Sequence, residues 1–404
     1  GGIGATNSGN VFITTNATNS TFSFVGGLSG GVVGASGGFL VNVLDSTSAV
    51  NIASTTELSG AGDTGKSQIN ATGALAINAL SNTTTENFAV SGSGGGVAIA
   101  LAANINLITT TTTITSTANQ SFASGGDTTM IANETANIEG TGGSVAVGGA
   151  GFGASLDYVN FAATTGVTLG ASTAISSGGN VTIDVDSFRT VASNVVTGAG
   201  GSWAGISGSI SVIEMGGAAE SDGAEEQTEQ NARLADVNTA LQEDQDSGGS
   251  NDDSTAGDLT AYAGGSSVKS DVETSRKAVS VTGTAAVDNI GVSIGNNSSI
   301  QAGITEIGTG NINSLGRSDI TIDATAKNKV SHFSGSLAVG MVSGNVSVVV
   351  GTLSSDVGVT IGDNTNLNAD GTISIKALST RPSDADSLSA TAIAMGGGLF
   401  GVNA

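Results

Sequence analysis

The stretch GNVTIDV, residues 179–185, decides the fold, because short relatives of it recur along the chain at a nearly constant interval. Each relative alternates polar and apolar residues, and this alternation is typical of a β-strand. The last isoleucines of the copies are Ile77, Ile131, Ile183, Ile322 and Ile375. Apart from one long gap between Ile183 and Ile322, their spacing indicates a repeat of about 53 residues.

Two further elements accompany each repeat. A second strand pattern precedes the first one, and the distance from Leu169 to Ile183 is the same as that from Ile361 to Ile375. The third element is glycine-rich and continuously apolar, and it occurs at residues 31–35, 96–101, 144–147, 204–208, 335–339 and 397–401. A propeller would carry aromatic signatures and tight hairpin turns, which this chain lacks. An array of immunoglobulin-like sandwiches would need about 100 residues per unit and bulky cores.

The pattern therefore predicts an all-β fold, a right-handed parallel β-helix or β-solenoid. Three coils of about 18 residues would make one repeat, and without the interruption the chain would form about 19 coils in a rod of roughly 90 Å. Inward Val, Ile, Leu and Ala would stack in ladders, and the threonine run 109–113 would lie on an exposed strand face.

Composition excludes several classes of protein. The 404 residues include 63 glycines, one proline, one histidine and no cysteine, which removes collagen, disulfide scaffolds and thiolate metal sites. Lysine and arginine number 11 against 34 acidic residues, so at a net charge of −23 nucleic acid and anionic lipid are poor partners. No apolar run approaches the ~20 residues that a membrane-spanning helix requires.

One acidic insertion interrupts the repeats. The predicted organisation is solenoid over 1–215, an insertion over 216–278 and solenoid again over 279–404, within a single solenoid domain that is a fragment of a longer chain. Leu234, Val237 and Leu241 recur at helical spacing, which predicts an amphipathic α-helix over 224–242. A polar loop over 244–253 follows it.

Carbohydrate-active enzymes also use the parallel β-helix, so clustered carboxylates are the catalytic candidates. Asp184 and Asp186 share one face of a strand by the period of two, with Arg189 nearby. A solvated outer face of Asp and Arg is favoured over an active site, because the neighbouring repeats lack a second Asp pair. His332 is interpreted as a lone surface histidine, and Trp203, Tyr158 and Tyr262 are too scattered to form sugar platforms. No catalytic residue and no cofactor are predicted.

Calcium is the remaining chemical candidate. The insertion carries four hard oxygen ligands in its polar loop, Asp244, Asp246, Asp252 and Asp253. Gly249 occupies the sixth place of a calcium loop, but Thr255 stands at the twelfth in place of Glu. A solvated acidic loop is favoured over a specific calcium site.

The segments GGGVAIALAAN, VTIGDN and GNVTIDV, with an acidic insertion in one repeat, resemble the very large bacterial surface proteins of the haemagglutinin-like and leukotoxin-like adhesin class. These are exported by autotransporter or two-partner secretion. The resemblance implies an extracellular stalk or filament segment on the bacterial cell surface that mediates attachment and carries no catalytic residue. A polysaccharide-binding or polysaccharide-degrading β-helix and an ice-binding solenoid remain as alternatives.

The ends of the chain suggest a partner. The first and last strand patterns, near Ile3 and at 399–402, carry no cap, and uncapped solenoid ends expose unpaired strands. We therefore expect head-to-tail contact with flanking repeats or further copies, with a surface glycan or another cell's surface as a further partner.

Overall fold

The computed structural model describes residues 3–4, 9–53, 68–216, 289–303, 317–380 and 388–403. Within these ranges the chain is all-β and every strand pairing is parallel, which confirms the predicted class of parallel β-solenoid. The solenoid unit comprises residues 1–217 and 287–404, and residues 218–286 form a separate unit. The helix predicted over 224–242 and the acidic loop lie outside the described residues.

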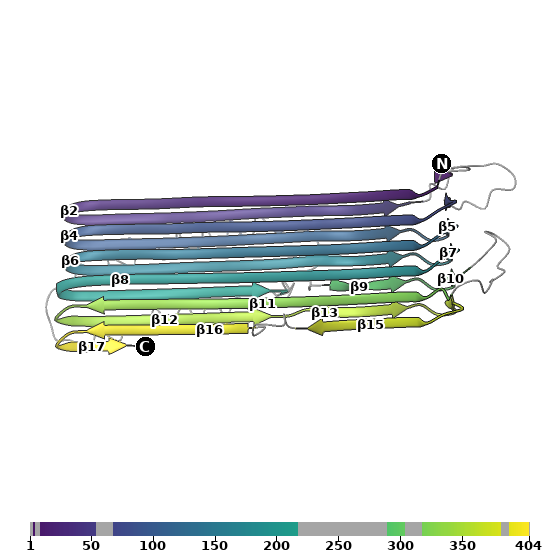
Figure 1. Cartoon of the computed structure of the whole chain (residues 1–404). Coiled ribbons are helices and arrows are strands. Elements are labelled where there is room, and N and C mark those ends of the chain that lie inside the picture. Colours follow the sequence, from purple (N-terminus) through teal and green to yellow (C-terminus); the bar gives the residue numbers. More distant parts are fainter. Residues whose placement is uncertain are drawn as a thin grey trace. The chain divides into compact units, whose positions relative to one another are not determined.

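Each coil combines one short strand with one long path. The first four long paths contain β2 (Val11–Ile52), β4 (Leu75–Ser116), β6 (Thr128–Leu169), and β8 (Val181–Met215) with β9 (Asn289–Ile294). The fifth contains β11 (Ile320–Val339), β12 (Val342–Leu353) and β13 (Asp356–Ile361), and the sixth β15 (Ile373–Thr380), β16 (Leu388–Gly397) and β17 (Phe400–Asn403). The short strands, which stack in that order as a six-stranded sheet, are β1 (Ile3–Gly4), β3 (Gln68–Ala71), β5 (Ser121–Ser124), β7 (Ala174–Ser177), β10 (Ser299–Ala302) and β14 (Asn366–Asn368). Figure 1 shows these coils stacked along the chain.

The coil is three times longer than the sequence predicted. Leu75 pairs with Thr128, and Thr128 pairs with Val181, so one turn of the solenoid takes up a whole sequence repeat. The prediction of about 18 residues per coil is wrong, because the alternating pattern continues through strands of 42 residues without the corners that a short coil requires. The described residues therefore form six coils, about 29 Å of stacked strands at ~4.8 Å per coil, in place of about 19 coils and roughly 90 Å.

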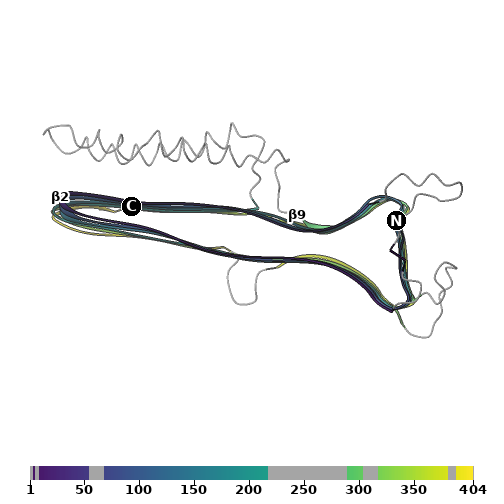
Figure 2. The same cartoon turned by 90° about the horizontal axis from the view of Figure 1, so that it is seen from above.

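The long path folds back on itself to make two facing walls. In the second coil we call residues 75–94 the outbound arm, 95–96 the tip and 97–116 the return arm, and the same names apply to residues in register in the other coils. The walls meet in a narrow turn beneath the β2 label in Figure 2 and spread toward the short strands. Hydrogen bonds cross between the walls, as from Ser155 Oγ to Ser144 Oγ at 3.1 Å.

Glycine makes the tip possible. Gly31 and Gly95 have φ values of 146° and 157°, which residues with side chains rarely adopt. A β-carbon on Gly95 would overlap the carbonyl oxygen of Gly31 in the preceding coil, and one on Gly148 would overlap that of Gly95. The glycine-rich segments of the sequence repeat therefore lie at the tips or directly beside them, where each coil reverses.

The interior changes character along the coil. Near the short strands, where the walls are far apart, isoleucines and a methionine of the central coils stack on one another and are fully buried. Among them are Ile77, Met130, Ile183 and Ile322. Toward the tip the buried residues are small and mostly polar, among them Ser93, Ser144, Thr197, Ser207 and Ser334. Small side chains let the two walls approach closely, and hydroxyl groups bond across the narrow gap.

The acidic segment interrupts one return arm. Phe161 pairs with Met215, but Thr164, which follows it closely on the same strand, pairs with Asn289. In the third coil, Ala162 and Ala163 alone connect Phe161 with Thr164. In the fourth coil, residues 216–288 connect the matching positions Met215 and Asn289. The solenoid resumes its register beyond the interruption, and Ile320 pairs with Val181.

Candidate functional site

Asp184 and Asp186 lie on the outer face of β8, as their spacing predicts, and both are half-buried. Asp184 stands beside Ile131 on one neighbouring strand and Asp323 on the other. Burial raises the pKa of Asp184, and the charges of Asp186 and Asp323 raise it further. Asp323 in turn forms an ion pair with the exposed Lys376, at 3.9 Å between Oδ2 and Nζ.

Arg189 does not join this acidic group. Odd-numbered residues of this part of β8 face inward and even-numbered ones face outward, so Arg189 points into the solenoid and is fully buried. The interpretation of Asp184, Asp186 and Arg189 as one solvated face is therefore wrong for the arginine. Successive residues of a strand point to opposite faces, so Asp184 and Asp186 share the outer face and Arg189 lies on the inner face.

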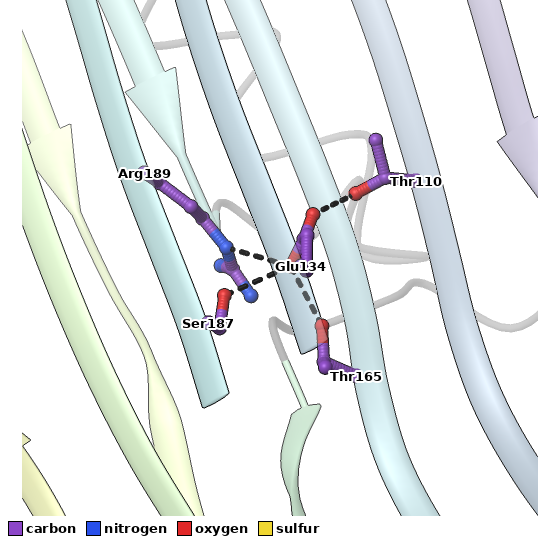
Figure 3. Close-up of polar contacts among 5 residues, drawn as sticks. All are labelled: Thr110, Glu134, Thr165, Ser187 and Arg189. Atoms are coloured by element: carbon purple, nitrogen blue, oxygen red, sulfur yellow. Dashed lines mark hydrogen bonds and ion pairs between the residues drawn. The ribbon is translucent and has the colours of Figure 1, made fainter. Parts of the chain in front are cut away.

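The partner of Arg189 is the buried Glu134 of β6, at 3.1 Å between Nε and Oε2 (Figure 3). Three hydroxyl groups also donate to this carboxylate: Thr165 at 2.6 Å, Ser187 at 2.8 Å and Thr110. The guanidinium carbon of Arg189 lies 5.6 Å from the centre of the Phe161 ring. Phe161 is the residue beside Met215, so this cluster lies next to the interruption of the return arm.

A second buried network contains Asp157 and His332. Asn104 Nδ2 donates to Asp157 Oδ1 at 2.8 Å, and Ser193 bonds to the same carboxyl group. Ser211 Oγ donates to Ser193 Oγ at 2.7 Å and lies 3.0 Å from His332 Nδ1. Burial raises the pKa of Asp157 to about 7, although the bonds from Ser193 and Asn104 oppose the rise.

His332 is not the surface histidine that the sequence suggested. It is 2% exposed on the inner face of β11, and burial lowers its pKa to about 4. Its Nε2 has no hydrogen-bond partner among the described residues. Asp157 and His332 therefore form one enclosed chain of hydrogen bonds across three coils, in which both groups are neutral below pH 7 and above pH 4.

The outer face of the outbound arm carries a shallow depression beside Asp186. Three strands line it with two rows of outward side chains, Asn133, Asp186 and Thr325 in one row and Thr135, Phe188 and Lys327 in the other, and the inward-facing Ser187 lies between the two rows. Phe188 is 40% exposed between Thr135 and Lys327 of the adjacent strands. A hydrogen-bond acceptor, a donor and an aromatic ring thus lie side by side in this depression.

The other sequence candidates do not meet at this place. Trp203 is exposed at the tip of the fourth coil, and the hydroxyl group of Tyr158 donates to Glu214 at 2.7 Å on the return arm. Tyr262 and the calcium candidates Asp244, Asp246, Asp252 and Asp253 lie outside the described residues. In the described part of the chain, no three His, Cys, Asp or Glu residues are placed to hold a metal ion.

No family model, curated protein or solved structure matches this chain. Among the described residues, no helix has the length and apolarity needed to cross a membrane.

Sequence reasoning missed Glu134 and Asp157 as buried groups. A signal for Glu134 was present, since it alternates with Met130, Ala132, Ala136 and Ile138 and so occupies an inward position. Asp157 likewise alternates with Val159 and Phe161. A charged residue in phase with an apolar ladder indicates an enclosed polar contact.

Proposed function

We propose that this chain is a structural and adhesive segment of a bacterial surface protein, a stalk or filament of stacked coils outside the cell that performs no catalysis. The observation that carries the proposal is the in-register stack of six coils with an unpaired edge at each end. In the described residues β2 pairs only with β4, and the last coil pairs only with the strands before it. Such a stack extends by adding coils.

The two open edges are complementary. Ile375 stands in the inward ladder that continues to Ile13 through Ile322, Ile183, Met130 and Ile77. Ile375 is 44% exposed, whereas its counterparts in the central coils are fully buried. The edge of the last coil can therefore receive the first coil of another copy, or of flanking repeats, in the same register, and this contact is the proposed head-to-tail partner surface.

The end-to-end contact is tested by sedimentation velocity on the whole chain over a range of concentrations. We expect oligomers of increasing length, and we expect Ile375→Glu to suppress them, because a charge in the ladder cannot be buried by the next coil. The matched control is Phe188→Glu, which adds the same charge to an outer face. A chain that stays monomeric at all concentrations, or an Ile375→Glu variant that still elongates, contradicts the proposal.

The proposed location is tested on intact cells that produce the protein. An antibody against the described coils should label unpermeabilised cells, and added protease should remove the label. Labelling that requires permeabilised cells contradicts a surface role.

The depression around Phe188 supports a second candidate, a polysaccharide-binding face. Phe188 offers a ring for a sugar to stack on, while Asp186, Asn133 and Lys327 offer hydrogen-bonding groups around it. Binding to a panel of surface polysaccharides should fall in Phe188→Ala and remain in Phe333→Ala. Phe333 is a suitable control because it has a similar exposure on the same wall but lies outside the depression. Product release that Asp184→Asn and Asp186→Asn abolish would instead indicate a degrading enzyme.

A further inference from the structure

The distal half of the outbound arm has an outer face without charge. We call it the apolar arm face, and it consists of the outward residues of segments 24–30, 88–94, 141–147, 194–200, 333–339 and 391–397, which lie side by side in the six coils. These segments contain no Asp, Glu, Lys or Arg. Large apolar side chains are well exposed on this face, with Leu28 at 92%, Val196 at 54% and Met395 at 56%.

In this part of the arm, the apolar side chains face outward and the polar side chains face inward. Alternating with the exposed apolar residues, the inward residues Ser93, Ser144, Thr197 and Ser336 are buried. Because the period of two fixes which residues face outward, the coil has no means of burying this apolar surface in its own interior. An exposed, contiguous apolar area of this kind marks an interaction surface.

The face is flat and large enough for a stable contact. The Phe24 ring lies over Gly26 and the Phe333 ring over Gly335, so that aromatic side chains cover these two glycines. Six strands at ~4.8 Å and four outward positions at ~6.8 Å give roughly 800 Å². A stable protein interface needs about 800 Å² from each partner.

A second copy of the chain fits this face better than a lipid surface does. Another copy presents an equally flat and charge-free sheet, and two such sheets can pack face to face at ~10 Å. At a net charge of −23, two copies repel each other elsewhere, so the charge-free face is the favoured place of contact.

We propose that two copies of this chain pair laterally, with the apolar arm face of one packed on the apolar arm face of the other. The contact is isologous, so the same surface serves both copies and the pair is closed. This lateral pairing rests on the proposed structural role. It adds contacts between neighbouring stacks to the proposed contacts along one stack. The two kinds of contact use different residues and can fail independently.

The absence of cysteine provides a direct test. Single-cysteine variants Val196→Cys, on the apolar arm face, and Phe188→Cys, on the polar part of the same strand and wall, are treated with a short bismaleimide cross-linker. Both sites are exposed in the single chain. We expect the Val196→Cys dimer to form in at least tenfold greater yield than the Phe188→Cys dimer. Equal yields, or no dimer from either variant, would overturn the proposal.

Sedimentation equilibrium measures the strength of the contact. We expect the combined change Val145→Glu and Val196→Glu to weaken dimerisation by at least about tenfold, with Phe188→Glu unchanged, because the new charges would be buried only in the dimer. Ile375→Glu, which blocks the end of the stack, should leave the lateral dimer intact. Loss of the dimer in Ile375→Glu alone would show that only end-to-end contact exists. Flotation with phosphatidylcholine vesicles that depends on Val145 and Val196 would assign the face to lipid and overturn the proposal.

Discussion

At the scale of single residues, the buried ion pair between Glu134 and Arg189 is held by several partners. The Glu134 carboxylate accepts from Arg189 and from three hydroxyl groups, and these donors come from three successive coils. Removing a single partner of a buried ion pair leaves the other charge without compensation, and such a change costs about 3–5 kcal/mol.

We therefore predict that Arg189→Met and Glu134→Gln each lower the midpoint of chemical denaturation strongly. The double variant should recover part of the loss, because neither change then leaves a buried charge unpaired. The measurement is the denaturation midpoint followed by circular dichroism. If the double variant is as unstable as the sum of the two single variants, the pair does not act as a unit.

Asp157 and His332 are accommodated by glycine on the opposite wall. A β-carbon on Gly140 would overlap the Asp157 carboxylate, and one on Gly351 would come within 2.6 Å of His332 Nε2. Asn104, Ser193 and Ser211 supply the polar contacts of this network. Burial favours the neutral form of both titratable groups.

The two groups predict opposite dependences of stability on pH. The pKa of Asp157 rises from 3.8 to about 7 on folding, so its contribution to stability is largest below pH 4 and falls by about 4 kcal/mol as the pH rises to 7. The pKa of His332 falls from 6.5 to about 4, so its contribution is largest above pH 6.5 and is lost as the pH falls toward 4.

Asp157→Asn should therefore make the midpoint of denaturation rise more steeply between pH 4 and pH 7 than it does in the unchanged chain. His332→Asn should have the opposite effect, since it removes the rising contribution of His332 and leaves the descending contribution of Asp157. Denaturation curves at half-unit intervals of pH distinguish the two. Parallel curves for all three proteins would show that neither group titrates differently in the folded state.

At the scale of elements, one corner of the coil is a ladder of left-handed residues. Asn119, Ser172, Asn297 and Asn364 have φ values between 56° and 61°, and each of the first three donates its backbone N–H to the next coil. Asparagine tolerates this conformation better than serine does. Ser172→Asn should therefore raise the thermal midpoint, with a gain of about 0.5 kcal/mol. Ser172→Val should lower the thermal midpoint. A higher thermal midpoint for Ser172→Val than for Ser172→Asn would show that this corner does not limit stability.

The tip glycines give a second prediction at this scale. Gly95→Ala should destabilise the stack, because both its φ of 157° and the carbonyl of Gly31 oppose a side chain. Gly344→Ala is the matched control, since a β-carbon there meets nothing within 4 Å. The comparison is made by hydrogen exchange at the tip, where Gly95→Ala should exchange faster than the control. Equal exchange rates in both variants would show that a side chain at position 95 is not opposed by the backbone of the tip.

The repeat and its strands could be predicted from the sequence because the period of two and the constant interval between the repeats are written directly in the chain. The length of the coil could not be predicted. A continuous alternation such as residues 75–116 does not reveal where a strand bends back, and the glycines within residues 92–96 do not show by themselves that Gly95 has the turn conformation. For the candidate residues too, one part could be predicted from the sequence and another part could not. The period of two places Asp184 and Asp186 together, while the partner of Arg189 follows only from the register between coils.

At the scale of the whole molecule, the acidic insertion and the solenoid can be separated by design. The third coil joins Phe161 to Thr164 through two alanines, and the fifth joins Leu353 to Asp356 through Ser354 and Ser355. Both neighbours of the interrupted coil therefore show that two residues suffice to connect Met215 with Asn289.

We predict that replacing residues 216–288 by Ala-Ala restores a regular fourth coil. The β-sheet signal of circular dichroism and the thermal midpoint should stay close to those of the unchanged chain, because every ladder on either side of the interruption is already in register. A junction of six glycine and serine residues serves as the control, since it should fold equally but exchange amide hydrogens faster at the return arm. Collapse of the sheet signal in both proteins would show that residues 216–288 are needed to hold the coils together, and that the insertion is a structural part of the solenoid.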